Sequence, residues 1–190
     1  MPDLIEPHVR VRESFLTAVE ESLADGRMIS EDSMIARWIR QYADRWHTEA
    51  GFAEFVDHLH ADATPDAARP SHHVPQSTWW LVDGDDYLGR ISSRHVLNDW
   101  LLEYGGHIGY EVRPSARRRG HATAMLRAVL PHAHALGIDP ALVTCDETNV
   151  ASRKVIEAAG GELEDVRGVK RRYWVPTGAM PRKAGRMART

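Results

Sequence analysis

Apolar side chains in the first third of the chain recur every three or four positions. Segments 11–27, 30–49 and 51–63 show this spacing, which places apolar residues on one face of a helix. Ser30 or Asp32 is the expected N-cap of the second helix, and Gly26 is the expected end of the first. The apolar faces of the first two segments comprise Val11, Phe15, Leu16, Val19, Leu23, Met34, Ile35, Trp38, Ile39, Tyr42 and Trp46. We therefore expect three N-terminal helices.

The pattern changes to that of strands after a loop that contains three prolines (63–77). Residues 77–97 are predicted to form two strands joined at Asp83-Gly84-Asp85, because an Asp-Gly pair favours a hairpin turn. Further strands are expected at 107–112 and 141–146, each followed by a helix, and residues 161–175 are expected to form a final hairpin. The strand–helix–strand unit has the size of a parallel crossover. The chain is thus predicted to be an α/β protein with one mixed sheet.

A loop of three arginines and a glycine, Arg117-Arg118-Arg119-Gly120, precedes the helix of this crossover. A helix N-terminus carries unpaired amide donors and a partial positive charge, so it can bind phosphate groups. Gly120 lets an anion approach the backbone closely, and the arginines add charges that pair with phosphate oxygens. The loop therefore predicts a pyrophosphate site.

The same residues resemble the signature of the GNAT N-acetyltransferases. Arg117-x-x-Gly120-x-Ala122 is similar to the family's Q/R-x-x-G-x-G/A, and residues 149–161 resemble its Asn-x-x-Ala/Ser segment through Asn149 and Ser152. The similarity spans roughly half of the chain, from Trp79 to Val175, in the family's order. It implies a GNAT-like sheet of about six to seven strands with a splayed central parallel pair, flanked by helices, with extra N-terminal helices.

The resemblance implies that acetyl-CoA is the co-substrate. The backbone amides that would hold its pyrophosphate belong to Arg118, Arg119, Gly120, His121, Ala122 and Thr123. The strand edge at Tyr110–Val112, which Arg113 follows, would pair with the pantetheine arm. Asn149, Ser152 and Lys154 would lie near the lower pantetheine or the adenosine phosphate.

The reaction that the resemblance implies is attack of a neutral amine on the thioester, while a base takes the amine proton and an acid protonates the thiolate. Many family members place a tyrosine acid four residues after the Ala/Ser, where this chain has Ile156. Tyr173 lies in the expected last strand but matches no motif. The identity of the acid is therefore open, and transfer driven mainly by proximity is an alternative.

Charge is distributed unevenly along the chain. Residues 1–105 contain 19 acidic and 9 basic side chains, whereas residues 106–190 contain 8 acidic and 15 basic ones, and the net charge is −3. Because the family builds its acceptor site largely from the N-terminal helices, this distribution favours a small cationic amine, such as an aminoglycoside-type antibiotic or a polyamine. The alternative to a cationic acceptor is that the charges merely cluster by chance on solvated faces of the protein.

Several residues near the splayed strand are candidates for the acceptor site. Glu103, His107 and Glu111 are candidate bases, and Tyr110 is a further candidate for the pocket. Each is equally compatible with a surface or sheet-packing role. Trp79 and Trp80 are adjacent on a strand and point to opposite faces, so one is expected in the core and the other can line the acceptor cleft.

Histidine spacing, the cysteine count and hydropathy bear on metal binding and on the cellular compartment. The 11 histidines include several pairs, but none has the spacing of a helix-borne zinc site, so no metal is expected. The chain has a single cysteine, Cys145, which we expect to be buried. No segment reads as a signal peptide or a membrane span, so we expect a cytoplasmic protein that does not bind membranes.

Three alternatives to the small-amine enzyme follow from the same features. The first is an acetyltransferase that acts on a protein or peptide amine. The second is a nucleic-acid-binding module that uses Arg117–Arg119 and the basic tail, although the acidic half argues against nucleic acid. The third is a GNAT-like fold that has lost catalysis.

We expect one domain over residues 1–177, with a helical acceptor portion (1–76), a sheet and acetyl-CoA portion (77–177) and a peripheral basic tail (178–190). Dimers are common in the family, and the final hairpin and tail are the expected interface of a homodimer.

Overall fold

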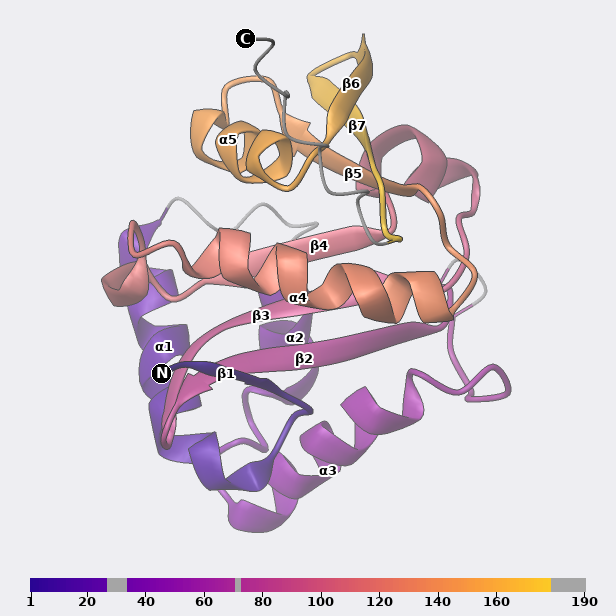
Figure 1. Ribbon diagram of the computed structural model, residues 1–190. Helices are drawn as coiled ribbons and strands as arrows, with labels where there is room; N and C mark the ends of the chain where they lie inside the picture. Colours follow the sequence, from indigo (N-terminus) through magenta and orange to yellow (C-terminus); the bar gives the residue numbers. More distant parts are fainter. Residues whose placement is uncertain (27–33, 71–72, 179–190) are drawn as a thin grey trace, which may run out of the picture.

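A computed structural model of the protein describes residues 1–26, 34–70 and 73–178. One seven-stranded sheet crosses it in the order β1-β2-β3-β4-β5-β7-β6 (Figure 1). The strands are β1 (Asp3–Ile5), β2 (Gln76–Asp83), β3 (Asp86–Arg94), β4 (Ile108–Val112), β5 (Ala141–Asp146), β6 (Glu162–Arg167) and β7 (Lys170–Val175). Only β4 and β5 are parallel neighbours; the other neighbouring strands are antiparallel. The expected mixed sheet with a central parallel pair is confirmed.

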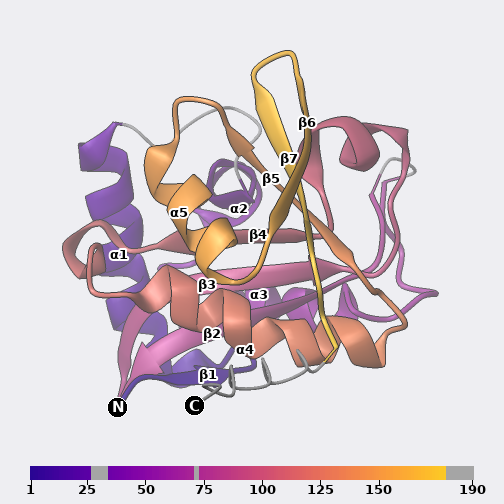
Figure 2. The same cartoon turned by 45° about the horizontal axis from the view of Figure 1, so that its top comes forward.

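Helices cover both faces of this sheet (Figures 1 and 2). The first three are α1 (Arg12–Asp25), α2 (Met34–Tyr42) and α3 (Glu49–Ala61), which pack together on one face. On the other face are α4 (His121–Ala135), which runs along β2 to β4, and α5 (Val150–Ala158), which lies beside β5. Three short turns complete the fold, η1 (Val9–Val11), the π-helical η2 (Leu101–Gly105) and η3 (Pro114–Ala116).

The alternation of apolar residues along β2 explains the two cores. Trp80 is fully buried among the aromatic side chains of α1 and α3, and its ring centroid lies 5.4 Å from that of Phe15. Trp79 points to the opposite face, where its ring lies 4.9 Å from that of His132 on α4. The sheet therefore separates an aromatic core under α1–α3 from an aliphatic core under α4 and α5.

The described residues correct four expectations about the N-terminal portion. β1 joins the sheet edge, so residues 1–76 are not helical throughout; three residues are too few for a periodic pattern. Leu23 is 49% exposed, because the last turn of α1 lies beside η3 rather than over the sheet. Trp46 is buried although α2 ends at Tyr42, since the chain turns there and returns the side chain to the core. The third helix begins at Glu49, two residues before the expected segment, because Thr48 caps it.

Two further expectations lie outside the described residues. These are the proposed caps Ser30 and Asp32, and the tail from residue 179 onward. The other expected ends are confirmed: Gly26 ends α1 in the left-handed conformation, and the side chain of Asn149 caps α5.

Candidate active site

The two parallel strands part after a single paired position. β4 pairs with β5 only at Ile108 and Val143. On the N-terminal side of that pair, the N–H of His107 donates to the carbonyl oxygen of Leu142 at 2.7 Å. The N–H of Leu142 donates to Nδ1 of His107 at 2.9 Å. On the C-terminal side of that pair, the edge of β4 at Tyr110–Val112 faces a gap and has no pairing with β5. The sheet thus opens at its centre, as the resemblance implies.

Gly106 makes the closed end of this gap possible. Its φ is 65°, and a Cβ at this position would lie 2.6 Å from the carbonyl oxygen of Leu142. A side chain would therefore push β4 away from β5 at the point where His107 joins them.

The loop between β4 and α4 offers a cradle for an anion at the open end of the gap. Arg118 and Gly120 adopt positive φ angles of 61° and 83°, which turn successive amides the same way. Within the described part of the chain, the backbone N–H groups of residues 118–123 form no hydrogen bond. A Cβ on Gly120 would meet no atom within 4 Å, so the space beside it is open. The cradle fits the pyrophosphate of acetyl-CoA.

The arginines of this loop have different roles. Arg117 Nη1 contacts the carboxylate of Asp25 at 2.7 Å, and Arg113 Nη2 contacts Glu21 at 2.6 Å. Glu21 also accepts a hydrogen bond from the N–H of Ser115 at 3.1 Å. Both arginines therefore fix the loop to α1, and the Arg117 guanidinium, which was expected to pair with phosphate, is directed at Asp25 instead.

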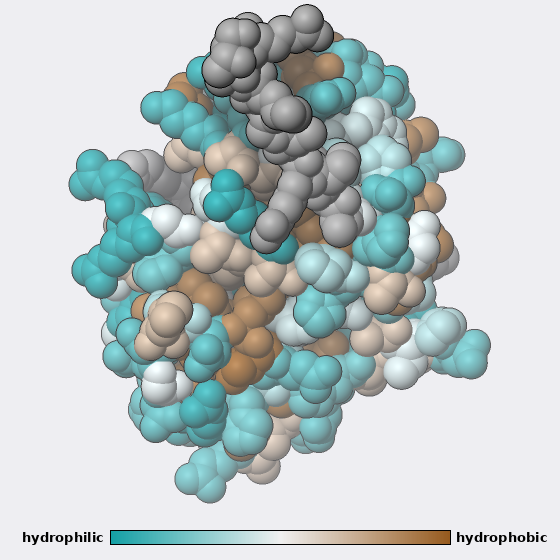
Figure 3. Space-filling view, viewed as in Figure 1, coloured by the Kyte–Doolittle hydropathy of each residue, from teal (hydrophilic) through white to brown (hydrophobic). Residues whose placement is uncertain are grey.

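Arg118 and Arg119 remain exposed and form no ion pair with the described residues. Hydrophilic side chains project at the edge of the molecule where this loop lies (Figure 3). These two guanidinium groups can therefore reach phosphate oxygens beside the cradle.

Glu111 presents a buried carboxylate on the face of β4 opposite α4. Its register partner on β3 is Arg90, and Oε2 of Glu111 lies 3.4 Å from Nη2 of Arg90. The Glu111 side chain is 10% exposed and borders a narrow cleft that Phe15, Ile35 and Arg113 also line. Burial raises the pKa of Glu111, although the positive charge of Arg90 opposes this shift. A buried carboxylate with a raised pKa is a stronger base than an exposed one, so Glu111 is suited to accept a proton.

Tyr110 points to the other face, toward α5. Its hydroxyl lies 2.7 Å from Oγ of Ser152, so this pair bridges the gap between β4 and α5. Burial raises the pKa of Tyr110 to about 12, which keeps the phenol protonated. Ile156, which replaces the family's tyrosine, is fully buried in the aliphatic core. The structure thus places the phenol of Tyr110 near the start of α5, whereas the motif position for a tyrosine is occupied by Ile156.

The other residues expected to contact acetyl-CoA lie at the start of α5 and in the first turn of α4. Oδ1 of Asn149 accepts the N–H of Ser152 at 3.0 Å as the helix cap. Lys154 is exposed on the second turn of α5. Among the expected cradle residues, His121, Ala122 and Thr123 form the first turn of α4 and are half-buried.

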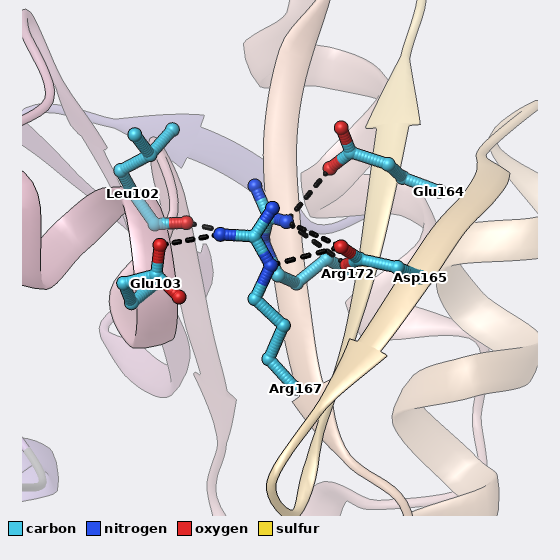
Figure 4. A network of polar contacts seen from close by, with 6 residues as sticks. All are labelled: Leu102, Glu103, Glu164, Asp165, Arg167 and Arg172. Atoms are coloured by element: carbon cyan, nitrogen blue, oxygen red, sulfur yellow. Dashed lines mark hydrogen bonds and ion pairs between the residues drawn. The ribbon is translucent and has the colours of Figure 1, made fainter.

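Two candidate catalytic residues lie away from the gap. Figure 4 shows the carboxylate of Glu103 directed at the guanidinium group of Arg167 on β6, next to the buried Arg172. Tyr173 is buried on β7, and β5 separates it from the gap. Burial raises the pKa of Tyr173, and the nearby Arg171 opposes this shift.

His107 and the two tryptophans also have structural surroundings. Burial lowers the pKa of His107 to about 4, and Arg94 adds to this shift, so the ring is neutral and serves as an acceptor for the Leu142 N–H. A base already occupied by a backbone amide is not free to take a proton from a substrate. Trp80 and Trp79 pack into the aromatic core and against α4, so neither lines the cleft beside Glu111.

Sequence reasoning missed Glu21 and Asp25, which hold the loop, and Arg90 and Arg94, which face Glu111's side of the sheet. Ion pairs between residues that are 92 positions apart leave no local pattern in the sequence. The arginines of β3 did carry a signal, because a charged side chain in an otherwise apolar strand is rarely buried without a role.

The described residues contain no group of three His, Cys, Asp or Glu side chains arranged to hold a metal ion. None of the described helices is both long and apolar enough to span a bilayer.

Comparison with known proteins identifies the relatives of this fold. A family model described as an acetyltransferase (GNAT) domain matches residues 15–162. A search of curated proteins gives no match. Solved structures with low sequence identity share the fold.

The PaiA N-acetyltransferase of Thermoplasma acidophilum, in complex with coenzyme A, is 10% identical, with a TM-score of 0.58 over 93% of this chain and 99% of its own. A microcin self-immunity acetyltransferase, MccE, in complex with acetyl-CoA and AMP, is 12% identical, with a TM-score of 0.62 over 92% of each chain. RimL, a ribosomal-protein alpha-N-acetyltransferase in complex with coenzyme A, is 15% identical, with a TM-score of 0.57 over 92% of this chain and 93% of its own.

Proposed function

The chain belongs to the GNAT acetyltransferase family and is an acetyl-CoA-dependent acyltransferase, and from this premise we propose that it acetylates the primary amine of a small acceptor. One observation carries the proposal. The gap between β4 and β5 has free backbone amides at its open end and the buried carboxylate of Glu111 on one face.

Acetyl-CoA supplies the acetyl group as a thioester when it is bound. The amides of residues 118–123 hold its pyrophosphate, with Arg118 and Arg119 beside them. The unpaired edge of β4 at Tyr110–Val112 accommodates the pantetheine arm. These positions are supported by the free hydrogen-bonding groups on this edge and in this loop.

Glu111 takes the proton of the attacking amine as the carbon–nitrogen bond forms and the carbon–sulfur bond breaks. Its raised pKa makes it a stronger base than an exposed carboxylate. Tyr110 donates its hydroxyl proton to the departing thiolate, and Ser152, hydrogen-bonded to it, can relay a proton back. In this proposal Tyr110 is the acid that position 156 does not provide.

The charge of the acceptor is a separate issue. Acidic residues of the N-terminal half favour a cationic acceptor such as an aminoglycoside or polyamine, but in the described structure several are paired: Glu21 with Arg113, Asp25 with Arg117 and Asp62 with Arg69. The structure therefore supports recognition of the amine by Glu111 more than recognition of a polycation by an acidic wall.

Thiol release from acetyl-CoA, measured with amino acids, polyamines, aminoglycosides and short peptides, tests the proposal. We expect turnover with at least one small amine and a loss of kcat/KM of about 10²- to 10⁴-fold in Glu111→Gln, with acetyl-CoA binding unchanged. Because Glu111 must be ionised, kcat/KM of the wild type should fall as the pH decreases through the raised pKa of Glu111, and the variant should lack this fall.

Glu162→Gln, on the exposed side of β6, is the matched control for loss of a carboxylate. Turnover confined to peptides would favour a protein N-acetyltransferase. Absence of thiol release with every amine, while acetyl-CoA binds, would contradict the proposed transfer.

A further inference from the structure

Two arginine side chains lie on the face of the sheet where Glu111 presents its carboxylate. Arg90 and Arg94 are four residues apart on β3, so they share a face, and their register partners on β2 are Trp80 and Gln76. This is the face of α1–α3, to which the fully buried Trp80 belongs. Arg90 is buried and Arg94 is half-buried. An arginine removed from water normally faces a carboxylate, so the partners of these two decide what the face can bind.

Arg90 forms an ion pair with Glu111. Its guanidinium carbon lies 5.1 Å from the ring centroid of Trp38, Nη2 lies 3.4 Å from Glu111 and Nη1 donates to Oγ of Ser92 at 3.3 Å. Its Nε is buried and has no hydrogen-bond partner among the described residues. Glu111 is therefore already balanced by one arginine.

Arg94 has no such counterion. Its Nη1 donates to the carbonyl oxygens of Gly105 and Gly106 at 3.1 and 3.0 Å, and no carboxylate of the described residues forms an ion pair with it. Burial lowers the pKa of Arg94 to about 10, and the charges of Arg90 and Arg37 add to the shift. Placing a full positive charge here is unfavourable until an anion comes close.

The position of Arg94 relates it to the gap. Both terminal nitrogens of its guanidinium group lie 3.7 Å from the place where a Cβ on Gly109 would be. Gly109 directly follows Ile108, the last residue of β4 that pairs with β5. Gly109 and Glu111 are two positions apart on the same face, or about 7 Å along the strand. Arg94 thus covers the closed end of the gap, a short distance from Glu111.

We propose that the acceptor is a primary amine that also carries a carboxylate or phosphate group, and that the guanidinium group of Arg94 binds this anion over Gly109 while the amine lies at Glu111. The inference rests on the proposed transfer to an amine. It narrows the acceptor to amino acids or peptides with a nearby carboxylate, or to amino compounds with a phosphate. A simple polyamine would bring a second cation to Arg94.

Matched pairs of amines that differ only in the anionic group test this inference. Each amino acid is compared with its carboxamide, and an amino sugar with its phosphate ester, in thiol release from acetyl-CoA. We expect the anionic member to be preferred about 10- to 100-fold in kcat/KM, because a charge-assisted, bidentate contact is lost in the neutral member. The two kinds of pair distinguish carboxylate from phosphate.

The variant Arg94→Gln should lose this preference, mainly through a higher KM for the anionic member, and Arg94→Lys should keep part of it. Arg45→Gln, which removes an exposed arginine of a distant ion pair, is the matched control. The comparison within the wild type does not depend on the folding of any variant.

The outcomes separate the two proposals. Equal or faster turnover of the neutral or polycationic members by the wild type would overturn the inference but leave the transfer to amines intact. An unchanged preference in a folded Arg94→Gln variant would also overturn the role of Arg94. Turnover of no amine at all would contradict the proposed function itself, and the inference with it.

Discussion

His107 shows how one side chain can complete a sheet. Its Nδ1 accepts the N–H of Leu142 at 2.9 Å, where a strand would use a backbone carbonyl, and this contact requires a neutral ring. The sequence placed His107 beside the splayed strand, but nothing in it distinguishes a base from an acceptor for a backbone amide. That distinction depends on Leu142, which is 35 positions away.

The low pKa of His107 predicts a dependence of stability on pH. Between the native pKa of about 4 and the ordinary value of 6.5, the unfolded chain binds a proton at His107 that the native state does not bind. The contribution of the neutral His107 to the free energy of unfolding is therefore complete above about pH 6.5 and decreases as the pH falls toward about 4. His107→Asn places an oxygen acceptor at the same position without titrating there. We expect urea unfolding at pH 7 and pH 4.5 to show a smaller loss of the free energy of unfolding in this variant than in the wild type.

His58→Asn, at an exposed position on α3, is the control for this measurement. An equal loss in the wild type and in His107→Asn would show that other groups account for the acid sensitivity.

At the scale of elements, local pattern and local capping were sufficient for much of the fold. The helix at α1, the hairpin of β2 and β3, and the strand–helix–strand unit around α4 follow from periodicity and from residues such as Gly26 and Asn149. The short β1 was missed because its three residues are ordered by pairing with β2 rather than by their own pattern. The return of Trp46 to the core depends on a turn that no residue spacing reveals.

α1 also acts as a clamp on the phosphate loop, which charge alone did not reveal. Burial would raise the pKa of Glu21, but hydrogen bonds from Arg113 and Ser115 outweigh it and lower the pKa. Arg117 was expected to pair with phosphate, whereas it binds a carboxylate of α1, as Arg113 does. In the proposed function the amides of the loop are therefore the main phosphate ligands, and their direction depends on the clamp.

Removing the clamp should loosen the loop. We expect Asp25→Asn to lower the free energy of unfolding by about 1–2 kcal/mol, since Arg117 loses a partly buried, charged partner. The KM for acetyl-CoA should rise severalfold while kcat changes little, because the amides lose their fixed direction. Urea unfolding and thiol-release kinetics measure the two effects.

Glu20→Gln, on the exposed side of the same helix, is the matched control. A lower KM in Asp25→Asn would contradict this account, since it would mean that Arg117, once released, binds phosphate directly.

At the scale of the whole molecule, the sheet joins two halves with different tasks. The family signature lies in the half that we propose holds acetyl-CoA, because the loop and the start of α5 carry its motif residues in order. The acceptor half has no such motif. The uneven charge of the chain pointed to an acidic pocket, but ion pairs consume several of those carboxylates and the buried face presents Arg90 and Arg94. Charge counts cannot predict which charges are left unpaired in a fold.

The central claim is that the loop before α4 binds the pyrophosphate of acetyl-CoA through its backbone, and titration calorimetry with Gly120→Ala tests it most directly. The matched control is Gly84→Ala in the β2–β3 turn: both glycines have positive φ, and a Cβ at either meets no atom within 4 Å. We predict that Gly120→Ala weakens acetyl-CoA binding about tenfold or more, about 1.4 kcal/mol, while Gly84→Ala leaves it unchanged. S-acetylpantetheine, which lacks the pyrophosphate, should bind Gly120→Ala and the wild type equally. Equal weakening of acetyl-CoA binding in both variants, or none in Gly120→Ala, would contradict the account.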